Sequence, residues 1–219
     1  MNQPESLKRA VLLNGVANSR ELGGYMTADG RKIKHGLLLR TAKLYGISDE
    51  DICILKESYN LQHIIDFRMP MEMIGSNDPV IDGAEYHHLN VIDMSDFVSE
   101  DAPAVDFNSL DLIGVTQLTI QSGMLEENMY IGFLMSDYGK KAFSKFFHIL
   151  IDADADRAVL WHCTGGKDRT GLAAMLLLSA LGVSENDIME DYRFLKIFDI
   201  YILRRIFCVL ILNYRNLVR

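Results

Sequence analysis

The segment AVLWHCTGGKDRTGLAAMLLLSALG, residues 158–182, combines the main fold signal with the densest group of reactive side chains in the chain. Residues 158–163 have the apolar character of a buried strand, and residues 170–182 form an apolar run that ends at a glycine, as a helix does. The loop between them holds a cysteine, a lysine, an aspartate and an arginine beside two glycines. A strand that leads directly into a helix indicates an α/β sheet, which binds ligands at the carboxyl ends of its strands.

The pattern around this segment agrees with that fold. Residues 36–42, 61–68 and 85–92 read as strands, and residues 48–58 and 139–152 read as helices, the first with Ser48 as its N-cap. Because strands alternate with helices, we predict an α/β fold with a central, mostly parallel sheet that helices flank on both faces.

Composition limits the possible functions. The 219 residues, 49% of them hydrophobic with only 4 prolines, suffice for one domain with a sizeable core. The net charge of −8 argues against nonspecific binding of nucleic acid. The three cysteines (Cys53, Cys163 and Cys208) are too widely spaced to indicate a disulfide framework or a metal site. We expect a cytoplasmic protein, because no secretory signal pattern or bilayer-length apolar run is visible.

The loop has the components of a phosphate site. A helix N-terminus offers unpaired N–H groups and a partial positive charge. Gly165 and Gly166 permit backbone angles that let successive amides converge on one anion, and Arg169 adds a planar fork for two oxygens. Cys163 lies at the base of this cradle, where Lys167 and the helix favour the thiolate that attacks phosphorus. Thr170 is placed to hydrogen-bond the sulfur when it leaves.

These residues resemble a known family. HCTGGKDRTG (162–171) is similar to the Cys-x5-Arg signature of the protein tyrosine phosphatase superfamily, in the HCxxGKDRTG form of the bacterial and fungal tyrosine/serine phosphatases. Three further stretches match that family: NSRELGGYMTADGRKIKHGLLLRTAKL (18–44), HIIDFRMPMEM (63–73) and IMEDY (188–192).

The resemblance implies a hydrolase of phosphotyrosine, with phosphoserine, phosphothreonine or phosphoinositides as further substrates, which needs no metal or cofactor. Cys163 would be the nucleophile, Arg169 the phosphate-binding arginine, Asp168 and Asp66 catalytic aspartates, and Lys167 the residue that admits phosphoinositides. The remaining substrate-binding positions would be Thr164, Gly165, Gly166, Thr170 and Gly171. Arg20 and Arg40 match arginines with a structural or substrate-orienting role.

Several alternatives stay open at this stage. No WPD-type loop supplies a proton donor, so the acid is Asp168, which we favour, or Asp66, Asp93 or Asp137. Asp66 also fits a residue that only pairs with a neighbour, and His162 fits a hydrogen bond to the loop backbone. His87 and His88 would point to opposite faces of a strand, which argues against a shared metal. The rival function is a catalytically silent phosphate-binding module.

We expect one phosphatase domain over residues 1–191, and two segments of the chain are unusual for such a domain. Residues 106–138 are long enough to form a lid or pocket wall. Residues 192–219 are apolar and carry six basic residues against one acidic residue. This tail fits a frameshifted or truncated end, or a helix that lies on a membrane surface. The oligomeric state is not readable from the sequence.

Overall fold

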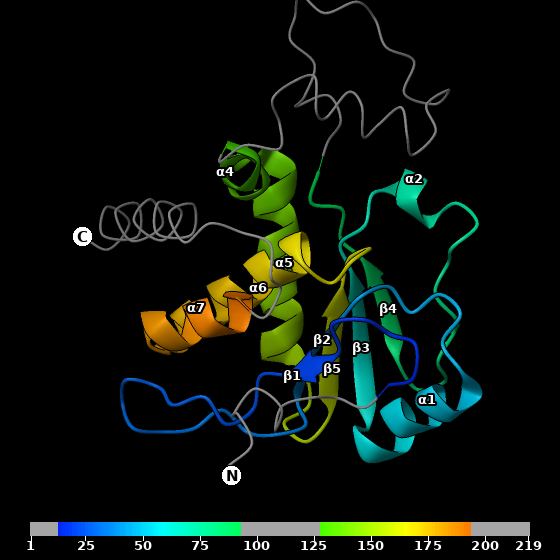
Figure 1. Cartoon of the computed structure of the whole chain (residues 1–219), viewed down its shortest axis with the longest axis horizontal. Helices are drawn as coiled ribbons and strands as arrows, with labels where there is room; N and C mark the ends of the chain where they lie inside the picture. Colours follow the sequence, from blue (N-terminus) through cyan, green and yellow to red (C-terminus); the bar gives the residue numbers. More distant parts are fainter. Residues whose placement is uncertain (1–12, 93–127, 194–219) are drawn as a thin grey trace, which may run out of the picture.

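The computed structural model describes residues 13–92 and 128–193 (Figure 1). In chain order its elements are β1 (Arg20–Glu21), β2 (Leu38–Thr41), α1 (Asp49–Cys53), the π-helical segment η2 (Ile54–Ser58), β3 (Leu61–Asp66), α2 (Pro70–Met73), β4 (Glu85–His88), α4 (Asn128–Met135), α5 (Asp137–Asp152), β5 (Ala158–His162), α6 (Asp168–Ala180) and α7 (Glu185–Arg193). Most of residues 106–138 and the 194–219 part of the tail lie outside the described residues, as do Asp93 and Cys208.

The strands form one sheet in the order β1-β2-β5-β3-β4. β2, β5, β3 and β4 are parallel, and the two-residue β1 is antiparallel to β2. This arrangement confirms the prediction of a mostly parallel α/β sheet. The carboxyl ends of β2, β5 and β3 meet at one edge, where Thr41 and Asp66 both pair with His162.

Helices cover both faces of this sheet. α5, α6 and α7 lie on one side, and α1 lies on the other (Figure 1). Side chains of β3 alternate between the two faces of the sheet and contribute to a hydrophobic core on each face. Ile65 packs with Trp161 and Phe146 on the α5 and α6 side, whereas Ile64 packs with Leu55 on the α1 side. The buried strands thus read as continuous apolar runs because both of their faces are covered.

Several element boundaries differ from the sequence prediction, and those of α6, β4 and α1 have clear local causes. α6 begins at Asp168, two residues earlier than expected, since an acidic residue is favourable in the first turn of a helix. β4 ends at His88 and not at residue 92, because the Asn90 side chain bonds both the N–H and the C=O of Ile92 and competes with the strand. α1 starts after Ser48, whose hydroxyl accepts from Asp51 N as predicted, but passes into the π-helical η2 at Ile54.

In the part of the chain that the structure describes, no helix has the length and apolar character needed to cross a membrane.

Candidate active site

The loop of residues 163–167 joins the central strand β5 to α6 at the carboxyl edge of the parallel sheet. Cys163 follows β5 directly, is only 2% exposed, and forms no disulfide. Lys167 is the N-cap of α6 but supplies no side-chain hydrogen bond to the helix. The loop therefore places a cysteine beside a helix N-terminus that no cap blocks, which is the arrangement expected for an anion site.

The two loop glycines play different parts. Gly166 has φ +66°, and a Cβ there would lie 2.5 Å from the carbonyl oxygen of Thr41, so no larger residue fits. Gly165 does not have a positive φ, and the nearest heavy atom to an added Cβ would be Lys167 Cγ at 3.9 Å. The expectation that both glycines are needed for their backbone angles is thus correct for Gly166 and wrong for Gly165.

Three donors outside the loop hold its backbone from behind. Asn18 Nδ2 donates to Gly165 O at 2.6 Å, Lys43 N to Thr164 O at 3.2 Å, and Arg40 Nη2 to Gly166 O at 3.2 Å. A trans peptide unit points its N–H opposite to its C=O. The amides of residues 165–167 therefore face away from these donors, as an anion-binding nest requires.

Arg20 and Arg40 belong to a buried ion network. Arg20 Nε lies 2.9 Å from Asp191 Oδ1, and Arg40 Nη1 lies 2.6 Å from Asp191 Oδ2. All three side chains are nearly or fully buried. Arg40 also bonds Gly166, so the network connects β1, β2 and α7 to the loop. Of the two roles left open for these arginines, the contacts favour the structural one. Asp191 belongs to the IMEDY motif, but the motif alone gave it no role.

Arg169 on the first turn of α6 is oriented by a residue that the sequence reasoning did not assign. Glu72 of α2 accepts from Arg169 Nη1 at 2.5 Å and from Nη2 at 2.7 Å, and Phe67 O accepts from Nη1 at 3.2 Å. Burial alone would lower the pKa of Arg169, but the hydrogen bonds to Glu72 and the proximity of Cys163, Glu72 and Asp168 raise it. The guanidinium is held, charged, within electrostatic reach of the cysteine.

Glu72 also fixes the loop itself. It accepts from the hydroxyl of Thr164 at 2.5 Å and from the amide of Met69 at 2.8 Å. Burial raises the pKa of Glu72, but the bonds from Arg169 and Thr164 outweigh it and leave the pKa below its usual range. Glu72 is thus an ionised positioning group. The only sequence signal for it was its place in the motif HIIDFRMPMEM.

Asp168, the favoured proton donor, directly follows the loop in the chain. It is the first residue of α6, and its Oδ1 accepts a 2.6 Å hydrogen bond from the hydroxyl of Tyr130 on α4. Tyr130 is 1% exposed, so its ring is fixed by packing. No sequence pattern identified Tyr130. Asp137, an alternative acid, is exposed at the start of α5.

Asp66 lies behind the loop in a buried cluster of charged groups. Its carboxylate accepts from Arg68 Nη2 at 2.7 Å and from Tyr86 Oη at 2.6 Å, and Arg68 also pairs with Asp78 at 2.8 Å. Burial raises the pKa of Asp66, but the nearby His162 and the hydrogen bonds from Arg68 and Tyr86 lower it to about 2. These contacts favour the pairing role for Asp66, while a catalytic role stays a prediction.

The other predicted positions divide between loop and helix. His162 Nδ1 contacts Cys163 O at 3.3 Å, as expected, and its Nε2 lies 2.9 Å from Asp78. The buried hydroxyl of Thr170 has no hydrogen-bond partner within residues 13–92 and 128–193, so the expected bond to the cysteine sulfur is not formed there. Gly171 N donates to Lys167 O at 2.6 Å, which uses its amide inside the helix and not in the loop.

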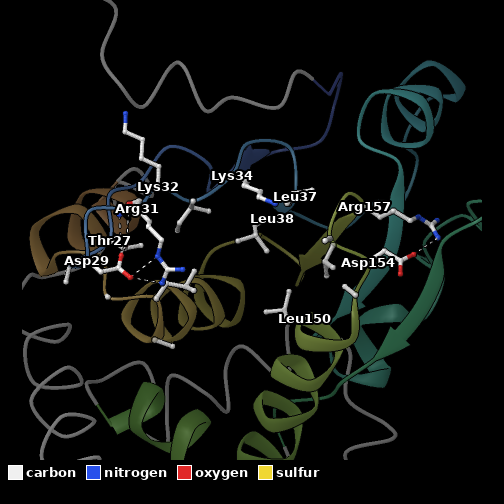
Figure 2. Close-up of a pocket in the computed structure, with 18 residues that line it drawn as sticks. Thr27, Asp29, Arg31, Lys32, Lys34, Leu37, Leu38, Leu150, Asp154 and Arg157 are labelled. Atoms are coloured by element: carbon white, nitrogen blue, oxygen red, sulfur yellow. Dashed lines mark hydrogen bonds and ion pairs between the residues drawn. The ribbon is translucent and has the colours of Figure 1, made fainter.

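A separate cavity of about 700 Å³ lies at the opposite edge of the sheet, where β2 and β5 begin (Figure 2). Leu38, Leu150 and Val159 line its apolar part. Arg31 and Arg157 also line it, and each forms an ion pair, with Asp29 and Asp154 respectively (Figure 2). Its lining contains none of the predicted site residues, so it is not part of the phosphate loop.

A buried cysteine below a backbone nest, with an oriented arginine on the next helix, defines a class of proteins that hold a phosphoryl group against a sulfur nucleophile. Comparison with known proteins identifies the family. A model of the tyrosine phosphatase family matches residues 11–198, and the chain belongs to this family.

The individual matches are moderate. The chain is 32% identical over 177 residues to a tyrosine-protein phosphatase of Cupriavidus necator, covering 81% of this chain but only 59% of that relative. It is 26% identical over 193 residues to the triple specificity protein phosphatase PtpB of Mycobacterium tuberculosis, covering 82% of this chain and 67% of the relative. The solved catalytic core of Siw14 aligns at 15% identity over 94% of both chains with a TM-score of 0.39.

Proposed function

We propose that the protein hydrolyses phosphomonoesters, phosphotyrosine in proteins above all, through a phosphocysteine intermediate. The observation that carries the proposal is the position of Cys163 at the base of a loop whose amides face away from the three groups that hydrogen-bond its carbonyls. Glu72 holds the guanidinium of Arg169 next to this loop. Membership of the tyrosine phosphatase family supports the same chemistry.

In the first step the Cys163 thiolate attacks phosphorus, an S–P bond forms, and the P–O bond to the leaving group breaks. Arg169 and the amides of residues 165–167 bind the nonbridging oxygens, whose charge shifts during transfer. Asp168 donates its proton to the departing oxygen, so the alcohol or phenol leaves neutral. Tyr130 holds the Asp168 carboxyl group in place for this transfer.

In the second step water attacks the phosphocysteine. Asp168, now a carboxylate, takes a proton from the water as the P–O bond forms and the S–P bond breaks. The thiolate returns and inorganic phosphate is released. Each residue ends in its starting protonation state, so the proposed cycle needs no other reactant than water.

We also propose that Lys167 broadens the substrate range to phosphoinositides. Its ammonium group can only donate hydrogen bonds, so it does not cap the N-terminal amides of α6, and its positive charge suits a second phosphate of a polyanionic headgroup. Turnover of a phosphotyrosine peptide and of a phosphoinositide by Lys167→Ala would test this proposal. A selective loss on the phosphoinositide is expected, and an equal loss on both substrates would contradict it.

The deciding experiment compares hydrolysis of an aryl phosphate by the wild type and Cys163→Ser, with a chelator present. We expect activity in the wild type and none in the serine variant, because the hydroxyl is not ionised by the same surroundings. A folded wild type that binds phosphate without turning over substrate would instead establish the silent phosphate-binding module.

A further inference from the structure

A cluster of metal-binding side chains lies at the edge of the sheet, away from the phosphate loop. β3 and β4 are parallel, with His63 opposite Glu85 and Ile65 opposite His87. Residues two apart in a strand share a face, so His87 projects on the same side as its neighbour Glu85. Pairing of the strands therefore brings two imidazoles and a carboxylate together.

The three nearest ligand atoms have the spacing of a metal site. His63 Nδ1 lies 2.9 Å from His87 Nε2, and Glu85 Oε2 lies 3.7 Å and 3.8 Å from these two nitrogens. The nearest point that is equidistant from all three atoms lies in their plane, about 2.0 Å from each, which is at the short end of Zn–N and Zn–O bonds of about 2.0–2.2 Å. We propose that His63, Glu85 and His87 bind one Zn²⁺ ion.

The surroundings suit a divalent transition metal. The imidazole side chains are 12% and 11% exposed, so their orientation is restricted, whereas Glu85 is 69% exposed and leaves a path from solvent. Asp154 adds negative charge near His63, while Arg157 and Lys145 add positive charge.

A second cluster of similar composition is less suited to a metal ion. Asp66, Asp78 and His162 also have closely spaced ligand atoms. The guanidinium of Arg68, however, bonds both carboxylates and already supplies the cation there. Within the described ranges, the His63 cluster has no such internal cation, and its shortest contact is between the two imidazoles.

The proposed ion would cross-link the edge strand β4 to β3. Its position is distinct from the catalytic centre, because His63 pairs with Val159 at the start of β5, whereas Asp66 pairs with His162 next to the loop. With three protein ligands, the ion keeps one coordination position for water. Bound Zn²⁺ is thus expected to stabilise the fold by mass action and not to take part in phosphoryl transfer.

The test uses the full chain as Cys163→Ser, because the catalytic thiolate is itself a zinc ligand. Equilibrium dialysis of this variant against ZnCl₂ should give one ion per chain, and ZnCl₂ should raise the Tm by several degrees while MgCl₂ does not. Adding His87→Gln or the exposed Glu85→Gln should weaken zinc binding at least tenfold. Adding His148→Gln, which removes an exposed histidine on α5, should leave binding unchanged.

The variants separate the proposal from its alternatives. Glu85→Gln keeps the shape of an exposed side chain, so its result stands even if a histidine variant folds poorly. The proposal would be overturned if adding His87→Gln or Glu85→Gln to Cys163→Ser changed neither the zinc affinity nor the Tm shift. The cluster would then be only a pair of hydrogen-bonded histidines. Loss of binding in both variants, with His148→Gln unaffected, would establish it.

Discussion

At the scale of residues, Asp168 depends on a partner that is distant in sequence. The first turn of α6 fixes its backbone, and Tyr130 fixes one carboxylate oxygen at 2.6 Å. An acid that protonates a leaving group matters most when that group leaves poorly, because a good leaving group departs without a proton. The chemistry assigned to Asp168 therefore predicts how its loss depends on the substrate.

We predict that Asp168→Asn lowers kcat for phenyl phosphate by about 10²–10⁴-fold, the usual contribution of a positioned acid. The loss for p-nitrophenyl phosphate, which has a better leaving group, should be much smaller. Tyr130→Phe should show the same substrate dependence with about a tenfold loss, the effect of one hydrogen bond. Equal losses of kcat on both substrates would contradict these roles, since a merely structural defect does not depend on the leaving group.

Asp66 gives a prediction about stability and pH. Its pKa is about 2 in the folded protein and about 3.9 in an unfolded chain. A depressed folded pKa contributes stability above the unfolded value, and that contribution is lost as pH falls from about 4 to about 2. We expect Asp66→Asn to lower the free energy of unfolding at pH 7 by about 2–3 kcal/mol.

Urea denaturation between pH 7 and pH 3 would measure this effect. The gap between Asp66→Asn and the wild type should narrow once the pH is below about 4. Asp82→Asn serves as a control, because Asp82 is 90% exposed and its ion pair with Lys56 spans 3.6 Å. A gap that stays constant down to pH 3 would show that the Asp66 carboxylate is not the source of the stability.

At the scale of elements, the loop and α6 depend on one glycine more than on the other. We predict that Gly166→Ala lowers kcat/KM for an aryl phosphate by at least about 100-fold, because its Cβ would collide with the Thr41 carbonyl at the base of the loop. Gly165→Ala should keep the wild-type free energy of unfolding within about 0.5 kcal/mol. Similar values of kcat/KM and of the free energy of unfolding in both variants would contradict this interpretation of the loop.

The contrast also shows how much the sequence could predict. The strands β2, β3 and β5 and the helices α5 and α6 were visible, because buried strands and amphipathic helices have strong periodic patterns. Cys163 and Arg169 were visible because they lie six positions apart in one short sequence motif. Glu72 and Tyr130 contact Arg169 and Asp168 from 97 and 38 residues away, respectively. No local pattern encodes such a contact, and the two-residue β1 is too short to have a pattern.

At the scale of the whole molecule, the carboxyl edge of the sheet is held together by two buried charge networks. Arg68 with Asp66 and Asp78 supports the β3 side, and Asp191 with Arg20 and Arg40 supports the β2 side. Both contact the loop, through His162 and Gly166 respectively. Cys163, the proposed nucleophile, therefore lies between two networks that reach β2, β3 and α7, and we expect the stability of α7 to affect the geometry of the loop.

This coupling leads to a prediction for Asp191, which is far from Cys163 in sequence and does not belong to the loop. Asp191→Asn should lower the free energy of unfolding by roughly 3–5 kcal/mol, because it leaves two buried guanidinium groups without their shared carboxylate. Thermal unfolding and aryl phosphate hydrolysis would be measured together, with Glu190→Gln on the exposed face of α7 as the matched control. Since Arg40 also bonds Gly166, kcat/KM should fall at temperatures where the variant is still folded. If the variant is destabilised but keeps full activity below its Tm, the network stabilises α7 without positioning the loop.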